Sequence, residues 1–180
     1  MLQEGGRVMR IASLTLGMLM LMGVVPGGSP GAWADGFPAA ERSLQVANSV
    51  WLTSKPDLRK LDSDRVGGVL IVDLRTSAEG TDEAAAQARN LGLRYQNIPV
   101  SGAVIDPDSV AALSAVLAAN GQGDVIIHCR SGNRAGLLWG AVQLEQGVPL
   151  EDVLVGVSDI VNRPGIENAL KDYAHTRESR

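Results

Sequence analysis

The residues with the clearest chemical potential form one short segment in the C-terminal half of the chain. The segment reads His-Cys-Arg-Ser-Gly-Asn-Arg, from His128 to Arg134, and contains Cys129, the one cysteine of the sequence. It follows a run of Val and Ile that predicts a strand buried on both faces. A thiolate is a strong nucleophile, so the segment is a candidate for covalent catalysis.

The glycine and the second arginine of the segment provide a setting for that cysteine. Gly132 permits a tight turn, so that successive backbone N–H groups can point inward at the start of a following helix. A helix N-terminus of this kind binds anions and favours a thiolate. Arg134, with four residues between it and Cys129, can hold a tetrahedral oxyanion through two hydrogen bonds. Together these residues predict chemistry on a phosphoryl or sulfur-oxy group.

The elements that must position this segment alternate between strand and helix patterns. Strands are predicted over 50–53, 69–74, 95–100 and 124–128, the last three of them buried. Helices are predicted over 57–64, 81–91, 107–120, 150–157 and 164–176, and from the cysteine segment to 146. Residues 35–48 are interpreted as a lead-in with a short helix. Such alternation is typical of an α/β fold, a central mostly parallel sheet with helices on both faces, and we expect one domain over 35–180.

Residues 1–34 have the pattern of an export signal. Arg7 and Arg10 precede an apolar run over 11–25, and Ala32-Trp33-Ala34 fits a cleavage site of small residues. We therefore expect a cut after Ala34 and a periplasmic or secreted domain. The apolar run is short for a bilayer, so we expect no stable membrane insertion after cleavage, with an uncleaved anchor as the alternative.

Composition excludes several function classes. The net charge is −4, which argues against a nucleic-acid partner. One cysteine and two histidines exclude an intramolecular disulfide and make a metal site improbable. We expect no metal and no cofactor.

The segment from His128 to Arg134 resembles the active loop of cysteine-dependent protein phosphatases of the tyrosine and dual-specificity type. It is most similar to a small bacterial phosphatase-like family that is also found fused to beta-lactamase-like hydrolases. Further matching motifs are Leu52-Thr53-Ser54-Lys55-Pro56-Asp57, Val72-Asp73-Leu74-Arg75, Gly92-Leu93-Arg94-Tyr95 and Ile98-Pro99-Val100. The family usually has Asn where this chain has Asp73. The resemblance implies a protein tyrosine phosphatase-like fold.

The resemblance also implies a reaction and a set of site residues. Cys129 would attack a phosphomonoester and form a phosphocysteine that water hydrolyses, and Arg134 would bind the oxyanion. Asp106 or Asp108 would protonate the leaving group. The substrate would be a phosphorylated small molecule or a phosphoprotein, and the predicted substrate-binding residues are His128, Arg130, Ser131, Gly132, Asn133, Ala135 and Arg75.

Two departures from the phosphatase pattern keep other functions open. Dual-specificity phosphatases place five residues between the cysteine and the arginine, whereas four is the spacing of rhodanese-type sulfurtransferases, which would carry a persulfide on Cys129. Phosphatases also usually have Ser or Thr after the arginine, where this chain has Ala135. That change favours slow turnover, or a domain that binds phosphorylated ligands without efficient hydrolysis.

Overall fold

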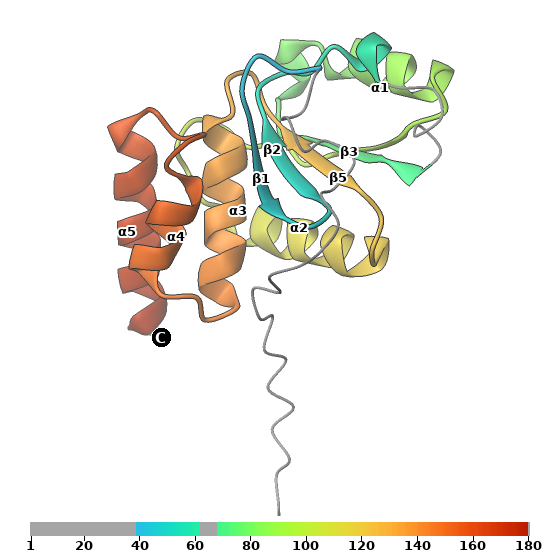
Figure 1. Cartoon of the computed structure of the whole chain (residues 1–180). Helices are drawn as coiled ribbons and strands as arrows, with labels where there is room; N and C mark the ends of the chain where they lie inside the picture. Colours follow the sequence, from blue (N-terminus) through green and yellow to red (C-terminus); the bar gives the residue numbers. More distant parts are fainter. Residues whose placement is uncertain (1–38, 62–67, 180) are drawn as a thin grey trace, which may run out of the picture.

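The computed structural model describes residues 39–61 and 68–179, so the predicted export signal lies outside the described residues. Its centre is a five-stranded sheet with the strand order β1-β2-β5-β3-β4 (Figure 1). The edge strand β1 is antiparallel to β2, and all other neighbouring pairs are parallel. The strands are β1 (Ser43–Ala47), β2 (Val50–Thr53), β3 (Leu70–Asp73), β4 (Arg94–Asn97) and β5 (Val125–His128).

Helices cover both faces of this sheet, which confirms the predicted α/β class. Figure 1 shows α1 on one side of the sheet and α2 on the other, with α3, α4 and α5 stacked beside it. The α-helices are α1 (Thr81–Asn90), α2 (Pro107–Asn120), α3 (Asn133–Glu145), α4 (Leu150–Val157) and α5 (Pro164–Glu178). Short 3-10 turns, η1 (Leu58–Lys60) and η3 (Ser77–Glu79), precede β3 and α1.

The alternation of side chains along the strands divides the hydrophobic core in two. On β5, Val125 and Ile127 belong to the larger core with α2, α3, α4 and α5, whereas Ile126 belongs to the smaller core with α1. Since successive strand residues point to opposite faces, His128 lies on the smaller-core face. The residues after β5 then lead directly into α3, so the predicted active loop joins the central strand to the most buried helix.

Most predicted elements are confirmed, and three are corrected. Residues 43–47 form β1 rather than a helix, because Leu44 and Val46 alternate with more polar residues and the segment pairs with β2. The helix predicted over 57–64 is the 3-10 turn η1 as far as residue 61, and 62–67 lie outside the described residues. The strand predicted over 95–100 is β4, which is half-exposed at the sheet edge rather than buried. Among the described residues, no helix combines the length and the hydrophobicity needed to cross a bilayer.

Candidate active site

Cys129 lies at the carboxyl end of the central strand β5, where parallel strands of an open sheet place their functional loops. Its N–H donates to the carbonyl oxygen of Thr53, and its Sγ accepts a hydrogen bond of 3.1 Å from the N–H of Gly132. Helix α3 begins at the next residue. The sulfur therefore lies at a helix N-terminus, where backbone amides and the helix dipole favour an anion.

Gly132 is required at this turn for two separate reasons. Its φ of 91° lies in the left-handed region that favours glycine. A Cβ atom built on Gly132 would also lie 2.7 Å from side-chain atoms of Ile160. Gly132, which has no side chain, therefore permits two things. It allows the turn that points its amide at the sulfur, and it allows the α4–α5 connection to pack closely against the loop.

Arg134 lies in the first turn of α3 and is held by a carboxylate from another part of the chain. Its Nη2 is 2.7 Å from Oε1 of Glu79, its Nη1 is 2.8 Å from Oε2, and Nη1 also donates to the carbonyl oxygen of Val100. The hydrogen bonds from Arg134 lower the pKa of Glu79 to about 2. Glu79 first, and then the nearby sulfur of Cys129, raise the pKa of the Arg134 guanidinium. The pair is therefore ionised at neutral pH beside the cysteine.

A cavity of about 450 Å³ opens over the loop, within the size range of small-molecule sites. Cys129 itself is only 1% exposed, so the loop residues that follow it form the wall of the cavity. The lining residues are Glu79, Gly102, Ala103, Arg130, Ser131, Asn133, Arg134, Arg163, Gly165 and Ile166. Three of them are arginines, which suits an anionic ligand.

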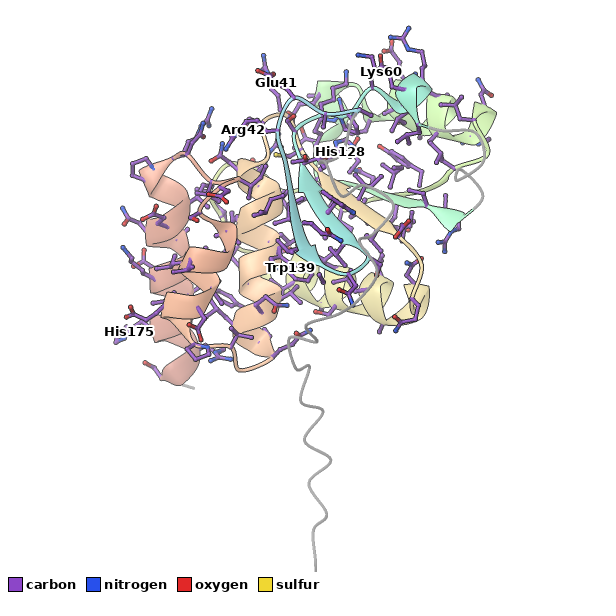
Figure 2. The ribbon with its side chains drawn as sticks, viewed as in Figure 1. Glu41, Arg42, Lys60, His128, Trp139 and His175 are labelled. Carbon is purple, nitrogen blue, oxygen red and sulfur yellow. The ribbon has the colours of Figure 1, made fainter. Side chains whose placement is uncertain are left out.

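The loop is anchored from outside by Arg42, which precedes β1. The Arg42 guanidinium donates to the carbonyl oxygen of Ser131 at 3.0 Å and to that of Ile160 at 2.7 Å. Figure 2 shows Arg42 at the same end of the sheet as His128, the residue before the cysteine. A single side chain thus joins the active loop to the connection between α4 and α5.

A second anchor joins the same two segments inside the cavity wall. The Asn133 side chain donates to Oδ1 of Asn162 at 2.8 Å, and the N–H of Asn162 donates back to Oδ1 of Asn133 at 3.0 Å. Asn133 also donates to Oγ of Ser131. Because both ends of the loop are held, its amides are fixed before any ligand arrives, as anion binding in a nest requires.

A buried polar network lies at the carboxyl end of β3, on the face of the sheet that carries the smaller core. Asp73 ends β3 and accepts hydrogen bonds from Arg75, with an Nη2–Oδ2 distance of 2.6 Å, and from the hydroxyl of Tyr95 at 2.8 Å. Nε2 of His128 lies 3.6 Å from the same carboxylate. Burial would raise the pKa of Asp73, but the hydrogen bonds from Arg75 hold it below its usual range. Burial lowers the pKa of His128 to about 4, so its ring is neutral.

The structure brings together most of the predicted loop residues. Arg130, Ser131, Asn133 and Arg134 line the cavity, and Gly132 forms the turn that meets the sulfur. Ala135 is fully buried in the larger core instead. His128 also lies outside the cavity wall, and its Nδ1 is 3.4 Å from the carbonyl oxygen of Cys129.

Three predicted site residues are not among those that line the cavity. Arg75 was expected to attract an anion at the site edge, but it is only 3% exposed and its guanidinium is bound to Asp73 and to the carbonyl oxygen of Glu79. Asp106 caps α2 by accepting from the N–H groups of Asp108 and Ser109, and neither aspartate is among the residues that line the cavity. This geometry gives no support to the prediction of a general acid at either position.

Sequence reasoning missed the residues that hold the loop from a distance. Thr76 and Glu79 form a capping box before α1, a pattern that can be recognised in the sequence. That pattern does not predict the ion pair between Glu79 and Arg134. Arg42 and Asn162 are more than 25 residues from their partners in the loop. Only the three-dimensional fold makes those contacts visible. Within the described ranges, no cluster of three or more His, Cys, Asp and Glu side chains is placed to hold a metal ion.

The family is decided by a sequence match that includes the active loop. Residues 43–146, from β1 to the end of α3, match the family described as "Beta-lactamase hydrolase-like protein, phosphatase-like domain". The chain belongs to this family. A beta-lactamase hydrolase-like protein of Xylella fastidiosa (strain 9a5c) is 34% identical over 112 residues, which are 59% of this chain and 26% of that protein. The matched part thus spans about a quarter of that relative.

Solved structures share the fold of this phosphatase-like domain. The core catalytic domain of a PP-IP phosphatase from S. cerevisiae, in complex with citrate, has a TM-score of 0.58 and 18% identity, and the match covers 81% of this chain and 92% of that one. TpbA of P. aeruginosa, in complex with phosphotyrosine, has a TM-score of 0.53 and 17% identity, with 76% and 89% covered. These likenesses establish a protein tyrosine phosphatase-like fold.

Proposed function

We propose that this phosphatase-like domain is a cysteine-dependent phosphatase that hydrolyses phosphomonoesters through a phosphocysteine. The observation that carries the proposal is the position of the Cys129 sulfur at the N-terminus of α3. It accepts the N–H of Gly132 there, beside an arginine that Glu79 holds in place. A nucleophile, preorganised amides and a fixed guanidinium are the components that phosphoryl transfer through a covalent intermediate requires.

Two steps complete the proposed reaction. The Cys129 thiolate forms a bond to phosphorus, and the phosphorus–oxygen bond to the leaving group breaks with its electron pair on oxygen. Water then adds to phosphorus, the sulfur–phosphorus bond breaks, and its electron pair returns to sulfur. The protons of that water stay on the released phosphate. Arg134 and the loop amides are placed to hold the phosphoryl oxygens, on which negative charge is concentrated throughout.

The comparisons support a phosphorylated substrate. One structural neighbour is a PP-IP phosphatase and another was crystallised with phosphotyrosine, so this fold accepts phosphate groups on both small molecules and side chains. For this chain we propose a phosphorylated small molecule or phosphoprotein. On the pattern of residues 1–34, we also propose that the domain acts in the periplasm or after secretion.

The direct test is phosphate release from p-nitrophenyl phosphate by the reduced protein, with Cys129→Ser alongside. We expect release that the variant lacks. Arg89→Gln is a matched surface control, because Arg89 is exposed on α1 away from the cavity. Absence of release from the wild-type protein, with its thiol shown to be reduced, would contradict the proposal.

Sulfur transfer is the second candidate, and the four-residue spacing between Cys129 and Arg134 favours it. Thiocyanate formation from thiosulfate and cyanide tests it in the same preparations. A sulfurtransferase would form thiocyanate and leave p-nitrophenyl phosphate intact. A domain that only binds phosphorylated ligands would do neither, yet would bind inorganic phosphate in both the wild-type protein and Cys129→Ser.

A further inference from the structure

We infer that the site is adapted to cleave a phosphoanhydride, a terminal phosphate carried on a second phosphate, in preference to an alkyl or unactivated aryl ester. The inference rests on the proposed phosphatase function and specifies its substrate class. Two features of the cavity support it independently. One is the set of groups that could protonate a leaving group, and the other is the pair of arginines that Glu79 does not bind.

The first feature is the carboxylate content of the cavity wall. Among the described residues that line the cavity, the one carboxylate is Glu79. Both of its oxygens accept hydrogen bonds from Arg134, and its N-terminal neighbour Thr76 donates to it as well. With a pKa of about 2, Glu79 carries no proton to give near neutral pH.

Among the described residues, neither Asp106 nor Asp108 belongs to the cavity lining. The connection from β4 to α2 contributes Gly102 and Ala103 to the wall, and neither has an ionisable side chain. Asp106 is engaged as the cap of α2. His128 lies on the other face of the sheet, is neutral, and is buried beside Asp73.

A phosphatase without a general acid is selective for its leaving group. Protonation of the departing oxygen typically contributes about 10²- to 10⁴-fold to the rate. Without it, the oxygen must leave as an anion. A tyrosine phenolate has a conjugate-acid pKa of about 10 and leaves slowly, and an alkoxide leaves more slowly still. A phosphate leaving group, whose second pKa is about 6, is stable as an anion at neutral pH.

The second feature is a pair of arginines that face the cavity without an ion-pair partner among the described residues. Arg130 follows Cys129 in the loop, and Arg163 is the N-cap residue of α5, so the two approach the cavity from different segments. Both are exposed. Arg134 is already paired with Glu79 beside the cysteine, whereas these two arginines can bind a second phosphate and stabilise its charge as it departs.

The proposed step balances without any added group. The Cys129 thiolate bonds to the terminal phosphorus, and the bridging phosphorus–oxygen bond breaks with its electron pair on the bridging oxygen. The product leaves as a phosphate monoester dianion, matched by Arg130 and Arg163. Water then releases inorganic phosphate from the cysteine as in the general mechanism above, and the thiolate is restored.

The test compares ADP with AMP as substrates of the full chain, because the two share a nucleoside and differ in the bond to the terminal phosphate. We expect kcat/KM for phosphate release to be at least about 100-fold higher for ADP, the lower limit of a general-acid contribution. Across aryl phosphates, kcat/KM should fall steeply as the pKa of the phenol rises. Arg163→Gln should lower kcat/KM by a larger factor for ADP than for p-nitrophenyl phosphate, whereas the control Arg89→Gln should lower neither.

The outcomes separate this inference from the function on which it rests. No release from p-nitrophenyl phosphate would mean that the phosphatase proposal itself fails. Release that depends on Cys129, with equal rates on ADP and AMP or with no dependence on the phenol pKa, would overturn the anhydride inference alone. So would a selective loss of activity on poor leaving groups in Asp106→Asn or Asp108→Asn, because that result would identify a general acid.

Discussion

Two arginine–carboxylate pairs lie within one small region of this domain, at nearly equal distances and in different surroundings. Arg75 and Asp73 are 2.6 Å apart, and their side chains are 4% and 0% exposed. Arg134 and Glu79 are 2.7 Å apart, at 14% and 28% exposure. The first pair is enclosed between the sheet and α1, and the second lines the cavity.

Because their surroundings differ, the two arginines have different roles. The Arg75 guanidinium is bound to Asp73 and to the carbonyl oxygen of Glu79 and cannot reach a ligand, although Arg75 lies only two residues beyond the end of β3. Arg134 is equally well bonded, yet it stands beside the Cys129 sulfur with the cavity open next to it. The enclosed pair should therefore affect folding stability, and the pair at the cavity should affect chemistry.

The largest expected effect is on stability. Arg75→Met removes one partner of the enclosed pair and leaves Asp73 buried without its main donor. Breaking a buried ion pair in this way typically destabilises by about 3–5 kcal/mol. Urea denaturation of the variant measures it. For comparison, Arg59→Met at the exposed Arg59–Asp57 pair should change stability far less. Equal effects of the two substitutions would contradict the assignment of Arg75 to the fold.

The second largest expected effect is the loss of activity when Arg134 of the Arg134–Glu79 pair is replaced. Arg134→Lys keeps the positive charge beside Glu79 but loses the planar guanidinium, whose several N–H donors can contact Glu79 and a phosphoryl group at the same time. We expect kcat/KM on p-nitrophenyl phosphate to fall by about 10²- to 10³-fold, as for the loss of one oxyanion donor. The urea midpoint should move much less than in Arg75→Met. A lysine variant with wild-type kcat/KM would show that Arg134 does not bind the reacting group.

A smaller loss of activity is expected at Glu79, a positioning residue for Arg134. Glu79→Gln keeps the size of the side chain but removes the charge that fixes the guanidinium. A displaced catalytic group can cost roughly 10²-fold, so we expect kcat to fall by about 10- to 100-fold. The pH profile distinguishes positioning from proton donation. If Glu79 only positions Arg134, kcat of the variant is lower at every pH and the shape of its pH profile is unchanged. Disappearance of one limb would instead identify Glu79 as an acid or base.

The smallest effect is the pH dependence of stability at His128. Its pKa is about 4 in the folded protein and about 6.5 when unfolded. Between those values the unfolded chain binds a proton that the folded chain excludes, so the free energy of unfolding falls as the pH falls. The slope contributed by this group is at most about 1.4 kcal/mol per pH unit. Glu79, whose pKa falls from 4.5 to about 2 on folding, adds a slope of the same sign below about pH 5, so the contribution of His128 is clearest above that pH.

Urea denaturation between pH 4 and pH 7 measures that slope. His128→Gln should flatten the profile in this window, because it removes the group that titrates. His175→Gln is the matched control, since His175 is exposed on α5 (Figure 2) and should leave the slope unchanged. Parallel profiles for wild type and His128→Gln would show that the buried ring does not contribute to the acid sensitivity of the fold.

The sequence alone predicts the fold and the loop well, for physical reasons. Continuous Val and Ile runs mark β3 and β5, and Asp106 with Pro107 marks the start of α2. The loop is predictable because the cysteine, the glycine and the arginine are close in sequence. Short spacing in the sequence therefore made the main parts of the loop predictable.

The contacts that fix the site are remote in sequence and were not predictable. Arg134 and Glu79 are 55 residues apart, and Arg42 and Ser131 are 89 apart. Arg75, just after β3, shows a different limit, because from the sequence alone an arginine there can serve a binding site or the fold. Only the burial of Asp73 beside it decides between the two. Similarly, Asp106 caps α2 and Asp108 lies in its first turn, and sequence reasoning could not separate these local roles from catalysis.

The most direct test of the account is to trap the phosphocysteine. Reduced protein is mixed with p-nitrophenyl phosphate and quenched in acid during turnover, and the Cys129 peptide is then analysed by mass spectrometry. We predict a population that carries one phosphoryl group on Cys129 and that is absent from Cys129→Ser. Steady release of phosphate without any such species, or with the phosphoryl group on another residue, would contradict the proposed role of Cys129.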